Sequence, residues 1–402
     1  MTPLIVGAGP VGKAAALFLA RAGIEARIID ATESPSTHSK ALAVNPRTLE
    51  LLRPTGLTEK MLALGIRAGS ARLWHGKKLA ARVSFDCLDH PFPFMLALSQ
   101  ATTERLLEEA LSEVGVRVER GLRLTNCHDR DDHVQAELTS GDTDDAEPVD
   151  CKWLLAADGA HSTVRHALGV HFDGSSFTAP WYLADIPLDT SLEEDCAHIF
   201  FARGGGFIFA IRVVGDGEEK SSGPLWRILC DRRELVASVP HSKSLGEPLW
   251  ESSFVPSHRL ASRLRVGNIF LAGDAAHVHS PVGARGMNLG IEDAWVFSQL
   301  AARRELKRYD DLRRPIDHGV VKRVALVSRV AQGHSPITRL VRDVATRFLI
   351  HLPFVQNRVR GTVTGLDHGL PWPVESEENM KGPSNVTRSG SSHPGERGPS
   401  PS

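Results

Sequence analysis

The start of the chain constrains its fold more than any other segment. Residues Leu4–Val6 form a short apolar run, Val11–Ala22 have the apolar spacing of a helix that ends at Gly23, and Ala26–Ile29 are apolar again. Two short buried strands separated by one helix are typical of a βαβ unit, whose strands lie parallel. The sequence therefore predicts an α/β fold built on a Rossmann-like sheet.

The turn after the first strand has the glycine spacing of a phosphate-binding loop. Gly7 permits a tight turn, Gly9 lets a pyrophosphate approach the backbone, and Gly12 lets the helix pack closely against the sheet. Pro10 and Val11 begin the helix, whose free N–H groups and positive dipole end would face the diphosphate. We therefore predict that these residues bind the phosphates of a nucleotide.

Two carboxylates follow buried strands at the edge where such folds bind their ligands. Asp30 closes the second strand, where it can accept hydrogen bonds from both hydroxyls of an adenosine ribose and would repel a 2′-phosphate. This choice favours FAD or NAD over NADP. Asp158 begins the segment Asp158–Ser162 after a second buried run. Taken alone, that segment is better explained as an ordinary Asp-Gly turn with Ser162 as a helix cap.

A third segment is the most specific. The buried run Asn268–Ala272 leads to Gly273 and Asp274, and Asp274 can accept hydrogen bonds from ribityl hydroxyls. A helix then opens, and its N-terminus would stabilise negative charge at the N1–C2=O edge of a reduced flavin. The loop and helix start contribute Pro281, Gly283, Gly286, Met287 and Asn288. FAD is long enough to touch all three glycine-rich segments, whereas His277 and His279 are expected to be structural.

Lys13 is unusual, because a cation in the first turn of a helix opposes the helix dipole. It either adds positive charge near the diphosphate or lies solvated at the surface, and the second interpretation is favoured.

Two blocks with β-like alternation, 67–97 and 173–262, interrupt the nucleotide-binding pattern. We predict that they form one mostly antiparallel sheet, a substrate domain inserted into an FAD-binding domain. The FAD-binding domain would comprise 1–66, 98–172 and 263–374, with helices from Trp295 onward to about residue 350. Residues 375–402 are rich in Ser, Gly, Pro and charge, and are predicted to be a disordered tail.

Composition excludes several functions. The formal net charge of −1 over 402 residues gives no general attraction to nucleic acid or an anionic membrane. No apolar run approaches the ~20 residues of a membrane helix, and no basic region precedes the first strand, so a cytoplasmic protein is predicted. The five cysteines are scattered and the histidines lack ligand spacing, so free thiols and no metal site are expected. The chain is expected to be a monomer or a homodimer.

Together these motifs resemble the group A flavoprotein monooxygenases, the para-hydroxybenzoate hydroxylase-like family, over about residues 1–320. The segment Lys40–Glu50 is similar to the family's stretch after the second strand. Gln100 stands before a predicted helix, and Tyr309 with Arg313–Pro315 completes the resemblance near its end.

The resemblance implies a set of cofactor contacts. Asp30 would hold the ribose, Asp158 would serve both FAD and NAD(P)H, and Asp274 would touch the ribityl chain. Further contacts implied for the cofactor are Lys40, Gln100, Gly286, Met287 and Asn288, with Leu124 as a weaker backbone candidate. Lys13 and Asp30 depart from the leucine and glutamate that are common in the family.

The activity implied is hydroxylation of a phenolic or polyketide-like aromatic ring. Non-covalent FAD would be reduced by NADPH or NADH and would react with dioxygen to give a C4a-hydroperoxyflavin. On the inserted sheet Phe209, Arg212 and Trp226 are candidate substrate contacts, although strand aromatics are more often core residues. The alternatives are a reductase or halogenase on the same scaffold, and a non-catalytic flavin-binding protein. The halogenase motif W-x-W-x-I-P is not matched by Trp181–Pro187.

Overall fold

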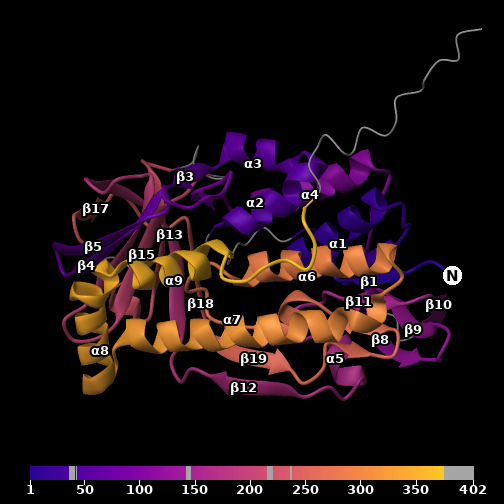
Figure 1. The fold of residues 1–402 in the computed structure, drawn as a ribbon. Helices are drawn as coiled ribbons and strands as arrows, with labels where there is room; N and C mark the ends of the chain where they lie inside the picture. Colours follow the sequence, from indigo (N-terminus) through magenta and orange to yellow (C-terminus); the bar gives the residue numbers. More distant parts are fainter. Residues whose placement is uncertain (36–40, 42, 142–145, 215–220, 236–237, 375–402) are drawn as a thin grey trace, which may run out of the picture.

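A six-stranded sheet carries the N-terminal βαβ unit in the computed structural model of the chain (Figure 1). The structure describes residues 1–35, 41, 43–141, 146–214, 221–235 and 238–374, so Lys40 and the predicted tail 375–402 lie outside the described residues. The strand order is β20-β21-β11-β1-β2-β7, with β20 antiparallel and the others parallel. Its strands are β1 (Leu4–Val6), β2 (Arg27–Asp30), β7 (Val118–Arg120), β11 (Leu154–Ala156), β20 (Arg265–Val266) and β21 (Ile269–Leu271).

Helices cover this sheet and pack on one another. Helix α1 (Pro10–Arg21) contacts both α4 (Gln100–Glu113) and α6 (Gly286–Ala302). The packing is close at the glycine turn, since a Cβ on Gly12 would lie 1.9 Å from the carbonyl oxygen of Gly7. Three further helices are α2 (Pro46–Leu52), α3 (Leu57–Leu64) and α5 (Thr163–Ala167); in Figure 1 α2 and α3 lie above the parallel sheet and α5 lies below it.

The two β-rich blocks meet in one eight-stranded sheet. Strand β4 lies parallel to β14, and the other pairs are antiparallel. The strands are β4 (Ser70–His75), β5 (Lys78–Ser84), β13 (Trp181–Thr190), β14 (Cys196–Phe201), β15 (Phe207–Arg212), β16 (Leu225–Cys230), β17 (Ser242–Ser244) and β18 (Trp250–Phe254). Segments far apart in the sequence thus share one β layer, which lies beside the parallel sheet in Figure 1.

Three smaller sheets complete the β structure of the described residues. The pair β3 (Ile66–Ala68) and β6 (Met95–Ala97) flanks the first block. A second small sheet consists of β12 (Phe172–Ser176), β19 (Ser257–Ala261) and β22 (His277–Val278). A hairpin sheet that the sequence did not predict comprises β8 (Leu122–Asp129), β9 (Val134–Ser140) and β10 (Glu147–Cys151).

The C-terminal part is helical. Helix α7 (Tyr309–Gln332) ends at Gly333, whose φ of 56° closes the helix, and α8 (Pro336–Arg347) follows a capping box of Ser335 and Thr338. Helix α9 (Pro353–Thr364) continues beyond residue 350, where the predicted helical region ended. In Figure 1, α6 and α7 run alongside each other, and α8 and α9 lie toward the eight-stranded sheet.

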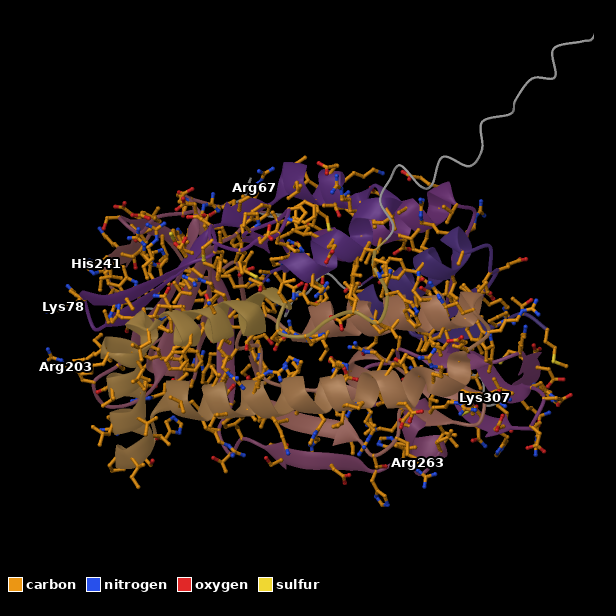
Figure 2. All side chains as sticks on the ribbon, in the orientation of Figure 1. Arg67, Lys78, Arg203, His241, Arg263 and Lys307 are labelled. Atoms are coloured by element: carbon orange, nitrogen blue, oxygen red, sulfur yellow. The ribbon has the colours of Figure 1, made fainter. Side chains whose placement is uncertain are left out.

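The favoured interpretation of Lys13 as a solvated surface residue is wrong. Its side chain is fully buried, and its ammonium lies 2.8 Å from Glu108 Oε2 and 3.6 Å from Glu104 Oε2. Both carboxylates belong to α4, so Lys13 joins α1 to α4. Charged side chains such as Lys78, Arg203 and Lys307 instead project from the surface (Figure 2). Among the described helices none combines the length and the apolar character needed to cross a membrane.

Candidate flavin site and substrate cavity

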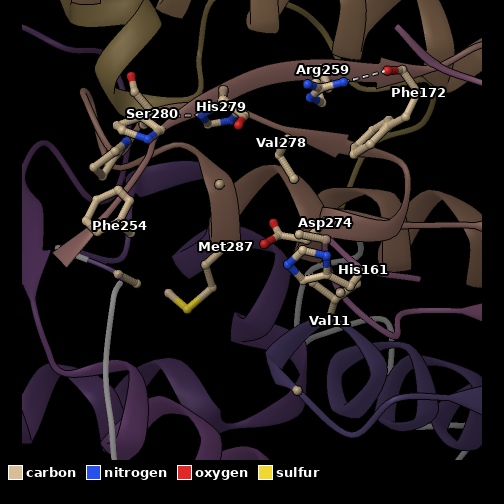
Figure 3. A pocket seen from close by; sticks show the side chains of 18 of the residues that line it. Val11, His161, Phe172, Phe254, Arg259, Asp274, Val278, His279, Ser280 and Met287 are labelled. Atoms are coloured by element: carbon tan, nitrogen blue, oxygen red, sulfur yellow. Dashed lines mark hydrogen bonds between the residues drawn. The ribbon is translucent and has the colours of Figure 1, made fainter. Parts of the chain in front are cut away.

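The three glycine-rich segments converge on one cavity of about 840 Å³ (Figure 3). The start of α1, the turn after β11, and the loop that leads from η4 (Gly273–Ala275) to α6 all reach it. From these segments the lining residues are Gly9, Pro10, Val11, Ala157, Gly159, Ala160, His161, Asp274, Pro281, Gly286 and Met287. Side chains of Val11, His161, Asp274 and Met287 surround the open space in the close view.

Gly9 leaves room for a ligand where Gly7 and Gly12 leave none. A Cβ on Gly7 would lie 2.3 Å from the Ala157 carbonyl oxygen, whereas a Cβ on Gly9 would have no heavy atom within 4 Å. Gly9 is also the N-cap of α1 and supplies no capping side chain. The first N–H groups of α1 therefore face the cavity without an intrahelical partner, which makes this end of the helix suitable for an anion.

Asp30 contacts the glycine turn. Its Oδ2 accepts the Ala8 N–H at 2.6 Å, and its Oδ1 accepts the Thr32 N–H at 2.8 Å and the Thr32 hydroxyl at 2.5 Å. Asp30 is not among the residues that line the cavity. The carboxylate therefore fixes the shape of the turn, while the predicted ribose contact stays a prediction.

Asp158 lies at the second segment with one oxygen unsatisfied. Its Oδ2 accepts the Val164 N–H at 3.2 Å, whereas its buried Oδ1 has no partner among the residues that the structure describes, and burial raises the pKa of this carboxyl. Ser162 caps α5 through the Arg165 N–H, as in the ordinary turn considered for this sequence. Arg165 donates to the carbonyl oxygens of Ala160 and Ala275 at 2.9 and 3.0 Å. The second and third segments are thereby tied together around the cavity.

Buried charges hold the third segment in place. Asp293 Oδ2 accepts the Gly273 N–H at 3.0 Å, and His277 Nε2 lies 2.7 Å from the same oxygen. Arg313 donates to Asp293 Oδ1 at 2.7 Å. His277 is therefore structural, as expected. His279 lines the cavity, and burial lowers its pKa to about 3, so it is neutral there.

Asn288 holds the loop that precedes α6. Its amide NH2 donates to Ala43 O at 2.9 Å and Ala284 O at 2.5 Å, and its Oδ1 accepts the Asn45 N–H at 3.0 Å. Asn288 is not a lining residue of the cavity, so its observed role is to join the loop to residues 43–45.

Of two further predicted cofactor contacts, one lines the cavity and the other does not. Gln100 lines the cavity, where its Oε1 accepts the Ala41 N–H at 3.2 Å and its NH2 donates to Glu104 at 2.9 Å. Leu124 is buried in β8 and is not a lining residue. The contact predicted for Lys40 lies outside the described residues.

A second cavity of about 450 Å³ adjoins the first. It lies between the eight-stranded sheet and helices α7 and α9, and its described wall is almost wholly apolar. Ala284 lines both cavities and has a φ of 52°, which is uncommon for alanine. Gly283, predicted as a cofactor contact, lines this second cavity. The loop Pro281–Ala284 therefore separates the predicted flavin site from an apolar chamber.

Of the three predicted substrate contacts, Phe209 lines the apolar chamber, whereas Arg212 and Trp226 do not. Successive residues of a strand point to opposite faces, so Phe209 faces the chamber while Arg212 faces away from it. Arg212 donates to the Leu225 carbonyl oxygen at 2.9 Å. Trp226, opposite Arg212 in the register, is fully buried in a separate core cluster.

Sequence reasoning missed the helical wall of the chamber. Val355, Val359 and Val363 line it from α9, and their spacing of four residues repeats along one face of a helix. That spacing was the available signal, although the segment Pro353–Thr364 also contains residues that form helices poorly in isolation.

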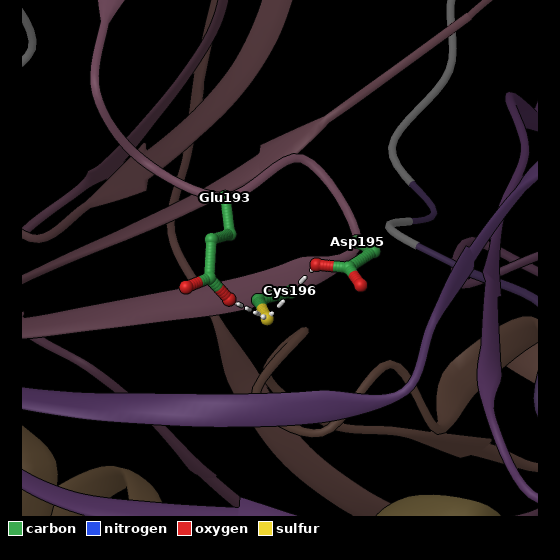
Figure 4. A group of neighbouring side chains, drawn as sticks. All are labelled: Glu193, Asp195 and Cys196. Atoms are coloured by element: carbon green, nitrogen blue, oxygen red, sulfur yellow. Dashed lines mark hydrogen bonds between the residues drawn. The ribbon is translucent and has the colours of Figure 1, made fainter.

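Two groups of side chains outside the cavities have ligand atoms close enough for a metal. In the first, Cys196 donates to Glu193 and Asp195 at 3.5 and 3.4 Å (Figure 4). Burial raises the pKa of the Cys196 thiol, so sulfur stays protonated and acts as a donor. In the second, the carboxylates of Asp293 and Asp317 already pair with Arg313, and His277 lies 2.7 Å from Asp293. Hydrogen bonding within the chain accounts for both groups.

Comparison with known proteins identifies the family. A family model described as an FAD binding domain matches residues 1–324. The chain is also 36% identical over 310 residues to 6-methylpretetramide 4-monooxygenase of Streptomyces rimosus, an alignment that covers 73% of this chain. The chain belongs to the group A FAD-dependent aromatic hydroxylases.

Two further similar proteins have names of the same kind. Pentachlorophenol 4-monooxygenase of Sphingobium chlorophenolicum is 28% identical, with 82% of this chain and 65% of that protein covered. The solved structure of OxyS anhydrotetracycline hydroxylase from Streptomyces rimosus superposes with a TM-score of 0.71 at 28% identity, with 92% of this chain and 77% of that chain covered. The chain spans 54% of the length of 6-methylpretetramide 4-monooxygenase, about half of it.

Proposed function

We propose that the chain is an FAD-dependent monooxygenase that hydroxylates an aromatic ring, phenolic or polyketide-like, with NAD(P)H and dioxygen. The observation that carries this proposal is the position of the apolar chamber. It adjoins the predicted flavin site at the loop Pro281–Ala284, and Ala284 lines both. An apolar ring in the chamber would therefore lie next to the cofactor. The names of the similar proteins, which include two anhydrotetracycline monooxygenases and pentachlorophenol 4-monooxygenase, support an aromatic substrate.

The residues of the larger cavity fit FAD. The space over Gly9 and the open N-terminus of α1 suit the diphosphate, and Asp274 projects into the cavity where it can accept from ribityl hydroxyls. Asp158, whose buried Oδ1 has no hydrogen-bond partner among the described residues, lies in sequence between the lining residues Ala157 and Gly159. When bound, FAD supplies the redox chemistry, which is to accept a hydride from NAD(P)H and to activate dioxygen.

The chain itself positions the reactants and excludes water. Gly286 and Met287 begin α6, whose N-terminal N–H groups would stabilise negative charge on the flavin edge. Phe209 and the neighbouring apolar side chains of the chamber would hold the substrate ring by burial of its surface. His279 at the cavity wall is neutral, so it would not contribute an imidazolium charge to this stabilisation.

This function implies that different parts of the chain bind FAD and the substrate. We propose that residues 1–66, 98–172 and 263–374 form the FAD-binding domain and that 67–97 and 173–262 form the substrate domain. The shared eight-stranded sheet of the two β-rich blocks supports this division.

The test is product formation from labelled dioxygen. The purified protein, loaded with FAD, is supplied with NADH or NADPH and a panel of phenols and polycyclic aromatics. We expect at least one aromatic compound to accelerate NAD(P)H oxidation and to acquire one labelled oxygen atom. Peroxide release alone would not support the proposal, since uncoupled flavoproteins also produce it. If aromatic compounds bound without ever acquiring label, a reductase or a flavin-binding protein would be the better description.

A further inference from the structure

The apolar chamber opens to solvent between α7 and α9. Four of its lining side chains are large, apolar and exposed: Leu326 is 64% exposed, Val327 47%, Phe354 70% and Val359 36%. Leu326 and Val327 belong to α7, and Phe354 and Val359 to α9. The remaining lining residues continue from this exposed rim to Ala284. A substrate would therefore enter at the rim, which is the mouth of the chamber.

Two arginines stand at this otherwise apolar wall. Among the described lining residues, Arg323, Arg358 and Thr362 are the ones with polar side chains, and none carries a carboxylate. Arg323 is paired, with its Nη2 2.6 Å from Asp367 Oδ2. Arg358 is exposed, and within the described ranges its guanidinium takes part in no hydrogen bond or ion pair. The chamber therefore presents one uncompensated positive charge to whatever occupies its mouth.

The position of Arg358 along α9 sets the length of the ligand. Val363 reaches the flavin-site loop, since a Cβ on Gly283 would lie 4.0 Å from its Cγ2. Arg358 precedes Val363 by five residues, which is about 7.5 Å along a helix axis. A single ring packed against Gly283 and Ala284 would fill this interval less completely than a longer ligand. A ligand of two or more fused rings would span it.

We propose that Arg358 binds an anionic group at the far end of a substrate with at least two fused rings. A carboxylate or an ionised enol or phenol at that end would pair with the guanidinium, while the ring to be hydroxylated lies at Ala284. The apolar wall would desolvate the anion, so its charge needs a partner at the mouth. This inference rests on the proposed function for the identity of the ligand, and Arg358 would determine specificity without taking part in the chemistry.

The test uses two ligands that differ in charge alone. Binding of 6-hydroxy-2-naphthoate and of 6-hydroxy-2-naphthamide to the oxidised, FAD-loaded full chain is followed by the change in flavin absorbance, without NAD(P)H. We expect the carboxylate to bind roughly 3- to 10-fold more tightly than the amide, the range for an ion pair that is partly exposed. Arg358→Gln should abolish this preference and leave amide binding unchanged, and Arg358→Lys should retain part of it.

The control is Arg347→Gln, since Arg347 is an exposed arginine of the adjacent α8 that does not line the chamber. It should keep the full preference for the carboxylate. Equal binding of both ligands to the wild type, or an undiminished preference in Arg358→Gln, would overturn the inference. Because binding is measured without turnover, a preference that depends on Arg358 in a protein that hydroxylates nothing would refute the proposed function alone.

Discussion

His277 Nε2 lies 2.7 Å from Asp293 Oδ2, the same oxygen that accepts the Gly273 N–H. A buried imidazole thus helps to fix the turn that carries Asp274 into the flavin cavity. Burial lowers the pKa of His277, but the carboxylates of Asp293 and Asp317 outweigh it and raise that pKa to about 9. His277 is therefore positively charged at neutral pH, and the turn depends on a buried ion pair.

This ion pair predicts a pH-dependent stability. The folded-state pKa of His277 lies above the unfolded value of about 6.5, so its contribution is complete below pH 6.5 and is lost as pH rises through about 9. The loss is on the order of 3 kcal/mol of unfolding free energy. Urea unfolding at intervals across that window should show this fall in the wild type and a smaller one in His277→Gln. Replacement of the exposed His351 by glutamine is the control, and an unchanged slope in His277→Gln would contradict the assignment.

Gly9 and Gly12 should respond differently to the same methyl group. A Cβ on Gly12 would lie 1.9 Å from Gly7 O, against rigid backbone, so Gly12→Ala is expected to prevent folding or to destabilise the chain severely. A Cβ on Gly9 meets nothing within 4 Å, so Gly9→Ala should fold and melt like the wild-type apoprotein. Its FAD affinity should nevertheless fall, because the methyl group occupies the diphosphate's space. If Gly9→Ala bound FAD with the affinity of the wild type, the diphosphate would have to lie elsewhere.

The N-terminal βαβ unit could be predicted from sequence because its signals are local. Apolar runs, glycine spacing and a closing acid lie within Leu4–Asp30, and the structure has these elements within a residue or two. The convergence of three distant segments was predicted because the carboxyl ends of parallel strands share an edge.

What could not be predicted depends on tertiary partners. Lys13 looks like a surface residue until α4 brings Glu104 and Glu108 beside it. Trp226 and Phe209 both lie on strands of the eight-stranded sheet, and only the strand register shows which one faces the chamber. The hairpin β8–β9 was missed because its two strands stabilise each other by pairing.

The buried Lys13 should contribute to stability without contributing to flavin affinity. Lys13→Met removes one partner and leaves Glu104 and Glu108 with less compensation, although Glu108 keeps a 2.8 Å ion pair with Arg120. We expect a loss of about 1–3 kcal/mol in unfolding free energy, at the lower end of the range for a broken buried pair. FAD affinity should stay within a factor of about two of the wild type, a difference of under ~0.5 kcal/mol. A large loss of FAD affinity in a stable Lys13→Met protein would support the interpretation in which Lys13 adds positive charge near the diphosphate.

Asp274 should be the carboxylate on which flavin occupancy depends most. Asp274 lies in the turn that Asp293 and His277 hold in place. Its side chain projects into the cavity opposite Met287 (Figure 3). A carboxylate that accepts from ligand hydroxyls contributes about 1.5–3 kcal/mol, so Asp274→Ala should weaken FAD binding roughly 10- to 150-fold. Asp274→Asn keeps an acceptor oxygen without the charge and should lose less. Asp173→Ala, at an exposed position of β12, should bind FAD like the wild type. Flavin titration of the apoproteins measures all three, and circular dichroism checks that each is folded. A folded Asp274→Ala protein with wild-type FAD affinity would mean that the ribityl chain is held by other groups.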